Sequence, residues 1–136
     1  MVYHLAAIAN PRTCQRDFPL AFDVNVSGTA NVLEASHHVA RFVLLSSIMV
    51  YGEPRYLPID DRHPLDGRDP YAASKIICEQ LVNISNFIHH VPFTIVRNSN
   101  TYGPNQSRDY LAPTLILEGL ESGSVEIWDP RTIRDF

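Results

Sequence analysis

A buried strand is predicted by the stretch Arg41-Phe42-Val43-Leu44-Leu45-Ser46-Ser47, an apolar run that ends in two serines. Two further short apolar runs, Val2-Tyr3-His4-Leu5-Ala6-Ala7 and Phe93-Thr94-Ile95-Val96-Arg97, predict strands of the same kind. A helix near residues 111–121 and a last strand at residues 125–128 complete the expected order. With helices between the first three strands, this order is typical of a parallel α/β sheet.

Two helices are predicted between these strands. Residues 10–19 are polar and contain two prolines, so we expect a loop there, followed by a helix over residues 20–38. For the second helix, Asp69 is a favourable N-cap and Pro70 suits the first helical position, which predicts a helix to about residue 89. The long segment 51–69, with three prolines and two glycines, is predicted to be a loop.

Each predicted helix shows an apolar stripe at helical spacing, which we expect to face the core. The stripe of the first helix consists of Phe22, Val26, Ala30, Leu33 and His37, and that of the second consists of Ile76, Ile77, Leu81, Ile84 and Ile88.

Composition bounds the class of protein. The 136 residues are 45% hydrophobic and carry a net charge of −4 with scattered arginines, so one globular domain is expected, without a surface for nucleic acid or acidic membranes. No apolar run approaches the roughly 20 residues that span a bilayer. Cys14 and Cys78 match no metal or disulfide pattern, and we expect a cytoplasmic protein. The six histidines are not predicted to bind metal.

The only lysine of the chain, Lys75, lies four residues after Tyr71. On a helix these positions share one face, so the two side chains project together. A nearby ammonium and the positive end of the helix dipole both favour the phenolate form of a tyrosine. Such a tyrosine can exchange a proton with a substrate hydroxyl while hydride moves to or from a cofactor.

Ser47 is expected at the carboxyl end of a strand, where parallel sheets bind their ligands. Its hydroxyl both donates and accepts, and could hold the reacting oxygen beside Tyr71. The ends of the other strands, at residues 6–7 and 98–100, fall on the same edge. Spacing alone leaves an alternative open, in which Tyr71 is an ordinary aromatic of a first helical turn, Lys75 is a solvated surface charge and Ser47 only ends a strand.

The segment Pro70-Tyr71-Ala72-Ala73-Ser74-Lys75 resembles the P-Y-x-x-S-K signature of the extended short-chain dehydrogenases/reductases, the family of NAD-dependent nucleotide-sugar epimerases and dehydratases. Further segments agree in the order of the family, so that the resemblance spans nearly the whole chain. They are His4-Leu5-Ala6-Ala7, Asn25-Val26-Ser27-Gly28-Thr29-Ala30-Asn31-Val32-Leu33-Glu34-Ala35, Ser46-Ser47-Ile48-Met49-Val50-Tyr51-Gly52, Arg97-Asn98-Ser99-Asn100-Thr101-Tyr102-Gly103-Pro104 and Arg134-Asp135-Phe136.

The resemblance implies a cofactor, NAD with NADP left open, and a nucleotide-sugar substrate. It implies that Tyr71 transfers the proton, that Ser47 is its hydroxyl partner, and that Lys75 binds the nicotinamide ribose and tunes the tyrosine. Asn100 and Arg134 would hold the substrate, the arginine at a diphosphate oxygen, although a loop-capping asparagine and a surface arginine are the open alternatives. The remaining cofactor contacts implied are Leu5, Ala6 and Ala7, and the backbone of Asn98 and Ser99.

The first departure from the family lies after Ser47. In the 4,6-dehydratases the next two positions are typically Asp and Glu, which perform the elimination, whereas this chain has Ile48 and Met49. Neither side chain can move a proton. We therefore expect epimerisation, as in UDP-glucose 4-epimerase, or reduction, in each case through a keto intermediate.

The second departure is the lack of a phosphate cradle. No two of the six glycines are separated by one residue, so G-x-G-x-x-G is absent. The first strand resembles the fourth strand of the family, so about 60 residues, or two βαβ units, are expected before it, and the family continues into the rest of its substrate lobe.

We therefore expect residues 1–136 to form the central and C-terminal part of a Rossmann-like domain, incomplete at both ends, from a larger enzyme. The isolated chain is expected to be inactive. The alternative is a short non-catalytic relative that binds a ligand or pairs with another chain. Homodimers are common in the family, through the helices that hold Asn25 and Tyr71, but the apolar stripes of both helices could equally be core.

Overall fold

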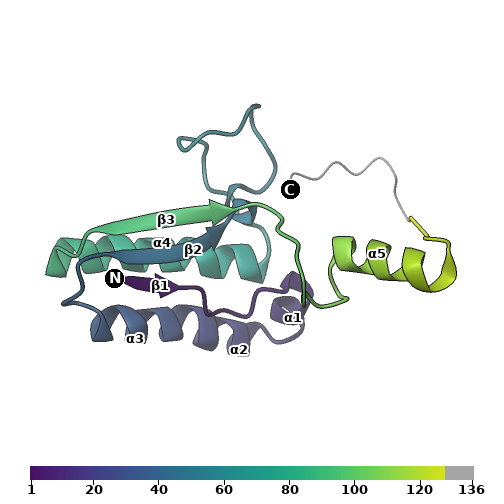
Figure 1. Ribbon diagram of the computed structural model, residues 1–136. Helices are drawn as coiled ribbons and strands as arrows, with labels where there is room; N and C mark the ends of the chain where they lie inside the picture. Colours follow the sequence, from purple (N-terminus) through teal and green to yellow (C-terminus); the bar gives the residue numbers. More distant parts are fainter. Residues whose placement is uncertain (128–136) are drawn as a thin grey trace. The chain divides into compact units, whose positions relative to one another are not determined.

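Three short parallel strands form the sheet of the protein, in the order β1 (Val2–His4), β2 (Phe42–Ser47) and β3 (Phe93–Asn98) (Figure 1). The computed structural model describes residues 1–127, and it divides the chain into residues 1–98, which hold the sheet, and a second unit from Ser99 onward. Because all strands run the same way, their carboxyl ends share one edge, where Ser47 pairs in register with Asn98. The parallel α/β sheet predicted from the sequence is confirmed.

The segment before β2 is more helical than predicted. Residues 10–19, expected to be a loop, include α1 (Pro11–Arg16) and the start of α2 (Phe18–Phe22), which continues through a π-helical turn, η1 (Asp23–Ser27), into α3 (Gly28–Ala35). The prolines fail to break helices here because each stands in a first turn, where no backbone N–H is needed. The side chains of Asn10 and Asp17 cap the two helices that follow them.

The buried stripe of this helical segment lies one position away from the predicted stripe. Ala21, Asn25, Thr29 and Leu33 are buried, whereas Phe22, Val26 and Ala30 are only half-buried and His37 is exposed. Of the predicted stripe, Leu33 is confirmed as core and Val26 packs against it. The rest was wrong because two of the four buried side chains are polar. Both find partners inside: Asn25 bonds the backbone of Ile8, and Thr29 bonds His4 at 2.8 Å.

The long helix α4 (Pro70–His89) begins and ends where the sequence predicts, with Asp69 accepting the backbone N–H groups of Tyr71 and Ala72. The predicted burial of its isoleucines is wrong. Ile77, Ile84 and Ile88 are exposed, and Ile76 and Leu81 are half-buried. The buried face instead consists of Tyr71, Ala72, Ser74, Lys75, Cys78, Glu79 and Val82.

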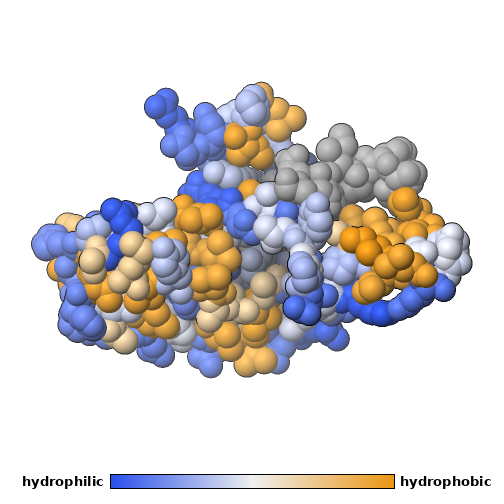
Figure 2. Space-filling model, viewed as in Figure 1, coloured by the Kyte–Doolittle hydropathy of each residue, from blue (hydrophilic) through white to orange (hydrophobic). Residues whose placement is uncertain are grey.

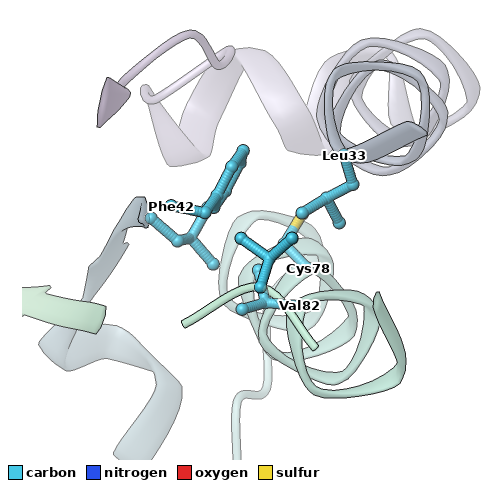
Figure 3. Close-up of a cluster of buried hydrophobic side chains, with 6 residues drawn as sticks. Leu33, Phe42, Cys78 and Val82 are labelled. Atoms are coloured by element: carbon cyan, nitrogen blue, oxygen red, sulfur yellow. The ribbon is translucent and has the colours of Figure 1, made fainter. Parts of the chain in front are cut away.

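The hydrophobic core lies on one face of the sheet. Figure 3 shows Leu33 of α3, Phe42 of β2, and Cys78 and Val82 of α4 pointing toward one another, so both helices cover the same face. On the other face, strand residues such as Tyr3 and Val96 are exposed, by 65% and 40%. Figure 2 shows hydrophobic residues, in orange, intermixed with polar residues, in blue, on the face in view.

A 3-10 turn, η2 (Ile48–Tyr51), follows β2 and leads into the predicted loop, the teal segment at the top of Figure 1. The loop is closed at its base, since the Asp66 N–H donates to the Val50 carbonyl at 2.9 Å. Gly52 is required at this closure: its φ is +62°, and a Cβ there would lie 2.1 Å from the Asp66 carbonyl oxygen.

The second unit contains one described helix, α5 (Leu111–Ser122), close to its predicted place. The strand predicted at residues 125–128 is wrong for residues 125–127, which are not in a strand, and Trp128 lies outside the described residues. Within residues 1–127, no helix is both long and apolar enough to cross a membrane.

Candidate active site

The carboxyl edge of the sheet and the start of α4 hold the three residues that the sequence predicts to react. Ser47 is the last residue of β2, and Tyr71 and Lys75 lie in the first two turns of α4. All three are buried, with exposed fractions of 8%, 8% and 4%. Lys75 is therefore not the solvated surface charge of the alternative interpretation.

The ammonium group of Lys75 lies beside the ring of Tyr71. Its Nζ is 5.9 Å from the ring centre and donates to the Leu45 carbonyl at 2.8 Å. Among the described residues Leu45 O is the only acceptor on Nζ, which leaves two N–H donors for a bound molecule. Burial lowers the pKa of Lys75, against the attraction of Cys78, Cys14 and Glu79. Lys75 is therefore a buried cation with two N–H donors that no described residue accepts.

Ser47 is held by the turn that it caps. Its Oγ accepts the Met49 N–H at 3.2 Å, at the start of η2, and η2 in turn contacts α4. The hydroxyl keeps its own proton, which can be donated to an oxygen of a bound molecule. The strand end therefore presents a fixed hydroxyl at the carboxyl edge of the sheet.

The segment after β1 offers small, accessible residues. Leu5 and Ala6 are exposed and Ala7 is half-buried. The next residue, Ile8, is fixed on both sides of its peptide, since its N–H donates to Asn25 Oδ1 at 2.7 Å and its carbonyl accepts from Asn25 Nδ2 at 3.1 Å. The exposed Leu5 and Ala6 thus stand next to a backbone position that is firmly held at Ile8.

The other predicted site residues lie in different parts of the chain. Asn98 ends β3, half-buried and in register with Ser47. Ser99 and Asn100 belong to the second unit, and Arg134 lies outside the described residues. The structure therefore brings Ser47, Tyr71, Lys75 and Asn98 to one edge within the first unit, whereas Asn100 is described only within its own unit.

Sequence reasoning missed a buried polar cluster next to this edge. Glu79, 2% exposed, accepts from Ser46 Oγ at 2.5 Å and from two nitrogens of Arg97, at 3.1 and 2.8 Å. Arg97 also donates to the Tyr51 hydroxyl at 2.9 Å, and these two partners raise the pKa of its guanidinium. A signal was present, because Glu79 follows Lys75 by four residues and so shares its buried face.

A second missed residue is Asn25. It is 1% exposed within η1, where its side chain bonds Ile8 and the hydroxyl of Ser74. Its signal was a polar residue near the middle of a predicted amphipathic helix. In the described part of the chain, no three His, Cys, Asp or Glu side chains are grouped so that they could hold a metal ion.

Comparisons with known proteins give a consistent family. The model of the NAD dependent epimerase/dehydratase family matches residues 1–136. A Methanocaldococcus jannaschii protein, provisionally named a UDP-glucose 4-epimerase, is 38% identical over 109 residues, which are 78% of this chain and 36% of that protein. A dTDP-glucose 4,6-dehydratase of an Actinoplanes species is 34% identical over 115 residues, 82% of this chain and 36% of the relative.

A solved structure shows the same architecture. UDP-glucuronic acid 4-epimerase from Bacillus cereus, in complex with UDP-glucuronic acid and NAD, superimposes with a TM-score of 0.81 at 33% identity, over 88% of this chain and 39% of that one. The chain thus spans little more than a third of the length of these relatives.

Proposed function

This chain belongs to the NAD dependent epimerase/dehydratase family, and we propose that it carries the proton-transfer centre of an epimerase that acts on a nucleotide sugar through a keto intermediate. The observation that carries the proposal is the pair formed by Tyr71 and the buried, sparsely bonded ammonium of Lys75. We call the longer protein that we propose contains this segment the full-length enzyme.

The residues present suit a nicotinamide cofactor, NAD, with NADP as the open alternative. The nicotinamide, when bound, accepts and returns a hydride. The two remaining donors of Lys75 fit ribose hydroxyls, and the accessible surface of Leu5, Ala6 and Ala7 fits a flat ring. The backbone of Asn98 and Ser99 is proposed to flank the nicotinamide.

Tyr71 is proposed to take the proton from a sugar hydroxyl and to give it back, while Ser47 holds the same oxygen. The Lys75 ammonium stabilises the phenolate form of Tyr71, which exists before the tyrosine takes the proton and again after it has given the proton back. Asn100 and Arg134 are proposed to hold the nucleotide sugar, the arginine at the diphosphate.

Epimerisation is preferred over dehydration because of the turn after Ser47. Ile48 and Met49 are the first two residues of η2, and neither side chain can exchange a proton with the sugar. A UDP-glucose 4-epimerase-like reaction therefore fits best, and reduction of a ketosugar, which needs the same proton transfer, is the second candidate.

The central test is Tyr71→Phe in the full-length enzyme. Conversion of UDP-glucose to its C4 epimer is expected to fall by about 10²- to 10⁴-fold, the usual contribution of a positioned acid or base. NAD affinity, followed by calorimetry, is expected to stay unchanged because the ring remains. Tyr56→Phe, at an exposed loop tyrosine, is the control. Wild-type turnover in the Tyr71→Phe variant would remove Tyr71 from the proposed role.

We also propose that residues 1–136 are the central and C-terminal part of a Rossmann-like domain, and that this segment alone is inactive. The exposed strand residues Tyr3 and Val96 support this, because sheets of this class are covered on both faces. The isolated segment is expected not to bind NAD tightly. Submicromolar binding in calorimetry would contradict this, and a ligand bound by the full-length enzyme without turnover would favour a non-catalytic ligand-binding or subunit-pairing module.

A pairing of two copies of the full-length enzyme, through the helical segment that holds Asn25 and through α4, which holds Tyr71, is proposed as well. Leu20 of α2, Val24 of η1, and Ile77 and Ile84 of α4 are exposed, so they can contribute to such a contact. Ile84→Glu is expected to give monomers in sedimentation, whereas the exposed control Gln80→Glu is not. Both cysteines are free and buried, which suits the reducing cytoplasm that we propose as location.

A further inference from the structure

The carboxylate of Glu79 joins the ends of two strands beside the candidate active site. Ser46 of β2 and Arg97 of β3 are partners in the sheet register, so their side chains emerge on the same face. Glu79 reaches both from α4 and accepts from Ser46 Oγ at 2.5 Å and from Arg97 at 3.1 and 2.8 Å. The next register pair along the strands is Ser47 and Asn98. Glu79 is therefore bonded to the immediate neighbours of two proposed site residues.

The same cluster continues to the far side of Ser47. Arg97 donates from its third nitrogen to the Tyr51 hydroxyl at 2.9 Å and lies over the Tyr51 ring, 5.0 Å from its centre. Tyr51 ends η2, the turn that Ser47 caps. The backbone is thus held before Ser47 by the side chain of Ser46 and after it by the side chain of Tyr51. Ser46 bonds Glu79 directly, and Tyr51 is linked to Glu79 through Arg97.

The type of contact favours positioning over mere filling of space. Glu79 is 2% exposed, and both of its oxygens receive donors of the guanidinium in the fork arrangement that fixes direction as well as distance. Apolar side chains in place of the whole Glu79–Arg97 pair could fill the same space with equal or better stability. They would not hold the ends of β2 and β3 in one geometry.

We propose that Glu79 is a positioning residue, which sets the carboxyl ends of β2 and β3, and with them Ser47 and Asn98, for the reaction. The effect on the reaction rests on the proposed function, whereas the effect on the strand ends does not. Glu79 itself contacts neither substrate nor cofactor in this proposal.

The first readout is backbone amide hydrogen exchange of the full-length enzyme with Glu79→Gln, which keeps the shape but not the charge. Exchange is expected to accelerate about tenfold or more at residues 46–51 and 97–98, and to change less than about twofold at residues 42–44 and 93–95. Glu34→Gln, at an exposed carboxylate of α3, is the matched control and should change neither set. Equal acceleration along both strands, or none at the strand ends, would overturn the proposal.

The second readout is whether the Glu79→Gln substitution changes kcat or KM of the full-length enzyme. If the strand ends position the reacting oxygen, Glu79→Gln lowers kcat roughly 10- to 100-fold and leaves KM for the nucleotide sugar nearly unchanged. A raised KM with wild-type kcat would contradict positioning for catalysis. If the wild-type enzyme turns over no nucleotide sugar, the proposed function is wrong, and the exchange pattern still decides the role of Glu79.

A second variant covers the case in which Glu79→Gln does not fold. Arg97→Lys keeps the positive charge but removes the fork and the bond to Tyr51. It should reproduce the localised exchange at residues 46–51. Unchanged exchange there would count against the proposal.

Discussion

Lys75 and Glu79 lie one turn apart on the same face of α4 and are almost equally buried, at 4% and 2% exposed. Their surroundings differ sharply. Glu79 accepts three hydrogen bonds, from Ser46 and Arg97, whereas Lys75 has a single bond to the Leu45 carbonyl among the described residues. Burial alone therefore does not distinguish a structural charge from a reactive one. The number and charge of the partners do.

The physical difference lies in how the loss of water is offset. Removing an ion from water costs several kcal/mol, which a well-formed ion pair recovers in part. Glu79 has that pair in Arg97, with Oε2 and Nη2 2.8 Å apart. Lys75 does not, and burial accordingly lowers the pKa of Lys75. A site that tolerates this cost has its ammonium ready for a ligand.

The strongest test of the comparison is Lys75→Met in the full-length enzyme. Epimerase turnover is expected to fall about 100-fold or more, because Tyr71 loses the cation beside it. The free energy of unfolding should stay the same or increase, because a costly buried charge is removed. Turnover assays and urea unfolding check the two halves. A variant that is strongly destabilised would show that Lys75 is as structural as Glu79.

Glu79→Ala should have the opposite profile, with stability as its main loss. Arg97 would lose its charged partner, which costs about 3–5 kcal/mol for a buried pair. The lower end is expected because the Arg97 side chain is 23% exposed. Glu121→Ala is the matched control, since Glu121 forms a 2.6 Å pair with Arg108 in which both side chains are more than half exposed. The loss of stability for Glu121→Ala in urea unfolding should be far smaller than that for Glu79→Ala, and equal losses would remove the contrast.

Ser46→Ala sharpens the comparison within the Glu79 cluster. It removes one donor to a buried carboxylate, and about 1.5 kcal/mol of stability should be lost, since Arg97 still holds Glu79. Ser122→Ala, at an exposed serine of α5, is the control in the same unfolding assay. A loss as large as that of Glu79→Ala would mean that the serine, not the arginine, carries the cluster.

The smallest expected effect is a change in the free energy of unfolding with pH that is caused by Lys75. Because burial lowers its folded pKa below the usual 10.5, the unfolded chain binds more protons between the two values, and stability rises with pH through that window. The stability advantage of the Lys75→Met variant over the wild-type protein should therefore narrow as the pH rises through the window. Unfolding of both proteins from neutral to alkaline pH measures it. The raised thiol pKa values of Cys14 and Cys78 act in the opposite direction but are present in both proteins. If the difference in free energy of unfolding between the wild-type protein and the Lys75→Met variant stayed the same across this pH range, the pH dependence would not belong to Lys75.

Much of the fold was predictable because strong local signals marked it. The strand ending at Ser47 and the helix from Pro70 to His89 were predicted nearly to the residue, by an apolar run and by a cap followed by proline. The buried faces of the helices were not, because hydrophobicity identified the isoleucines of α4, whereas the inner face uses polar residues such as Ser74 and Glu79. Their burial depends on partners from distant segments.

The candidate site shows the same division. Tyr71 and Lys75 were accessible to prediction because both lie on one helix, four residues apart. The four-residue spacing from Lys75 marks Glu79 itself, but its partners Ser46 and Arg97 lie 33 and 18 positions away in the chain, so no local spacing reveals these contacts. Arg97 ended a predicted strand, but which side chain it would meet depended on the helix that packs over that strand.

The closure at Gly52 separates the loop between Val50 and Asp66 from the sheet and helix on either side of it. The loop leaves after Val50 and returns at Asp66, where the bond between these residues and the close approach of Gly52 join its two ends. Within the loop, the buried ring of His63 packs against Tyr51 with 5.4 Å between ring centres, so changes that keep His63 are expected to leave Ser47 and Tyr71 in place. The two fixed ends thus make the loop a natural point of insertion, at which a designer could graft other segments.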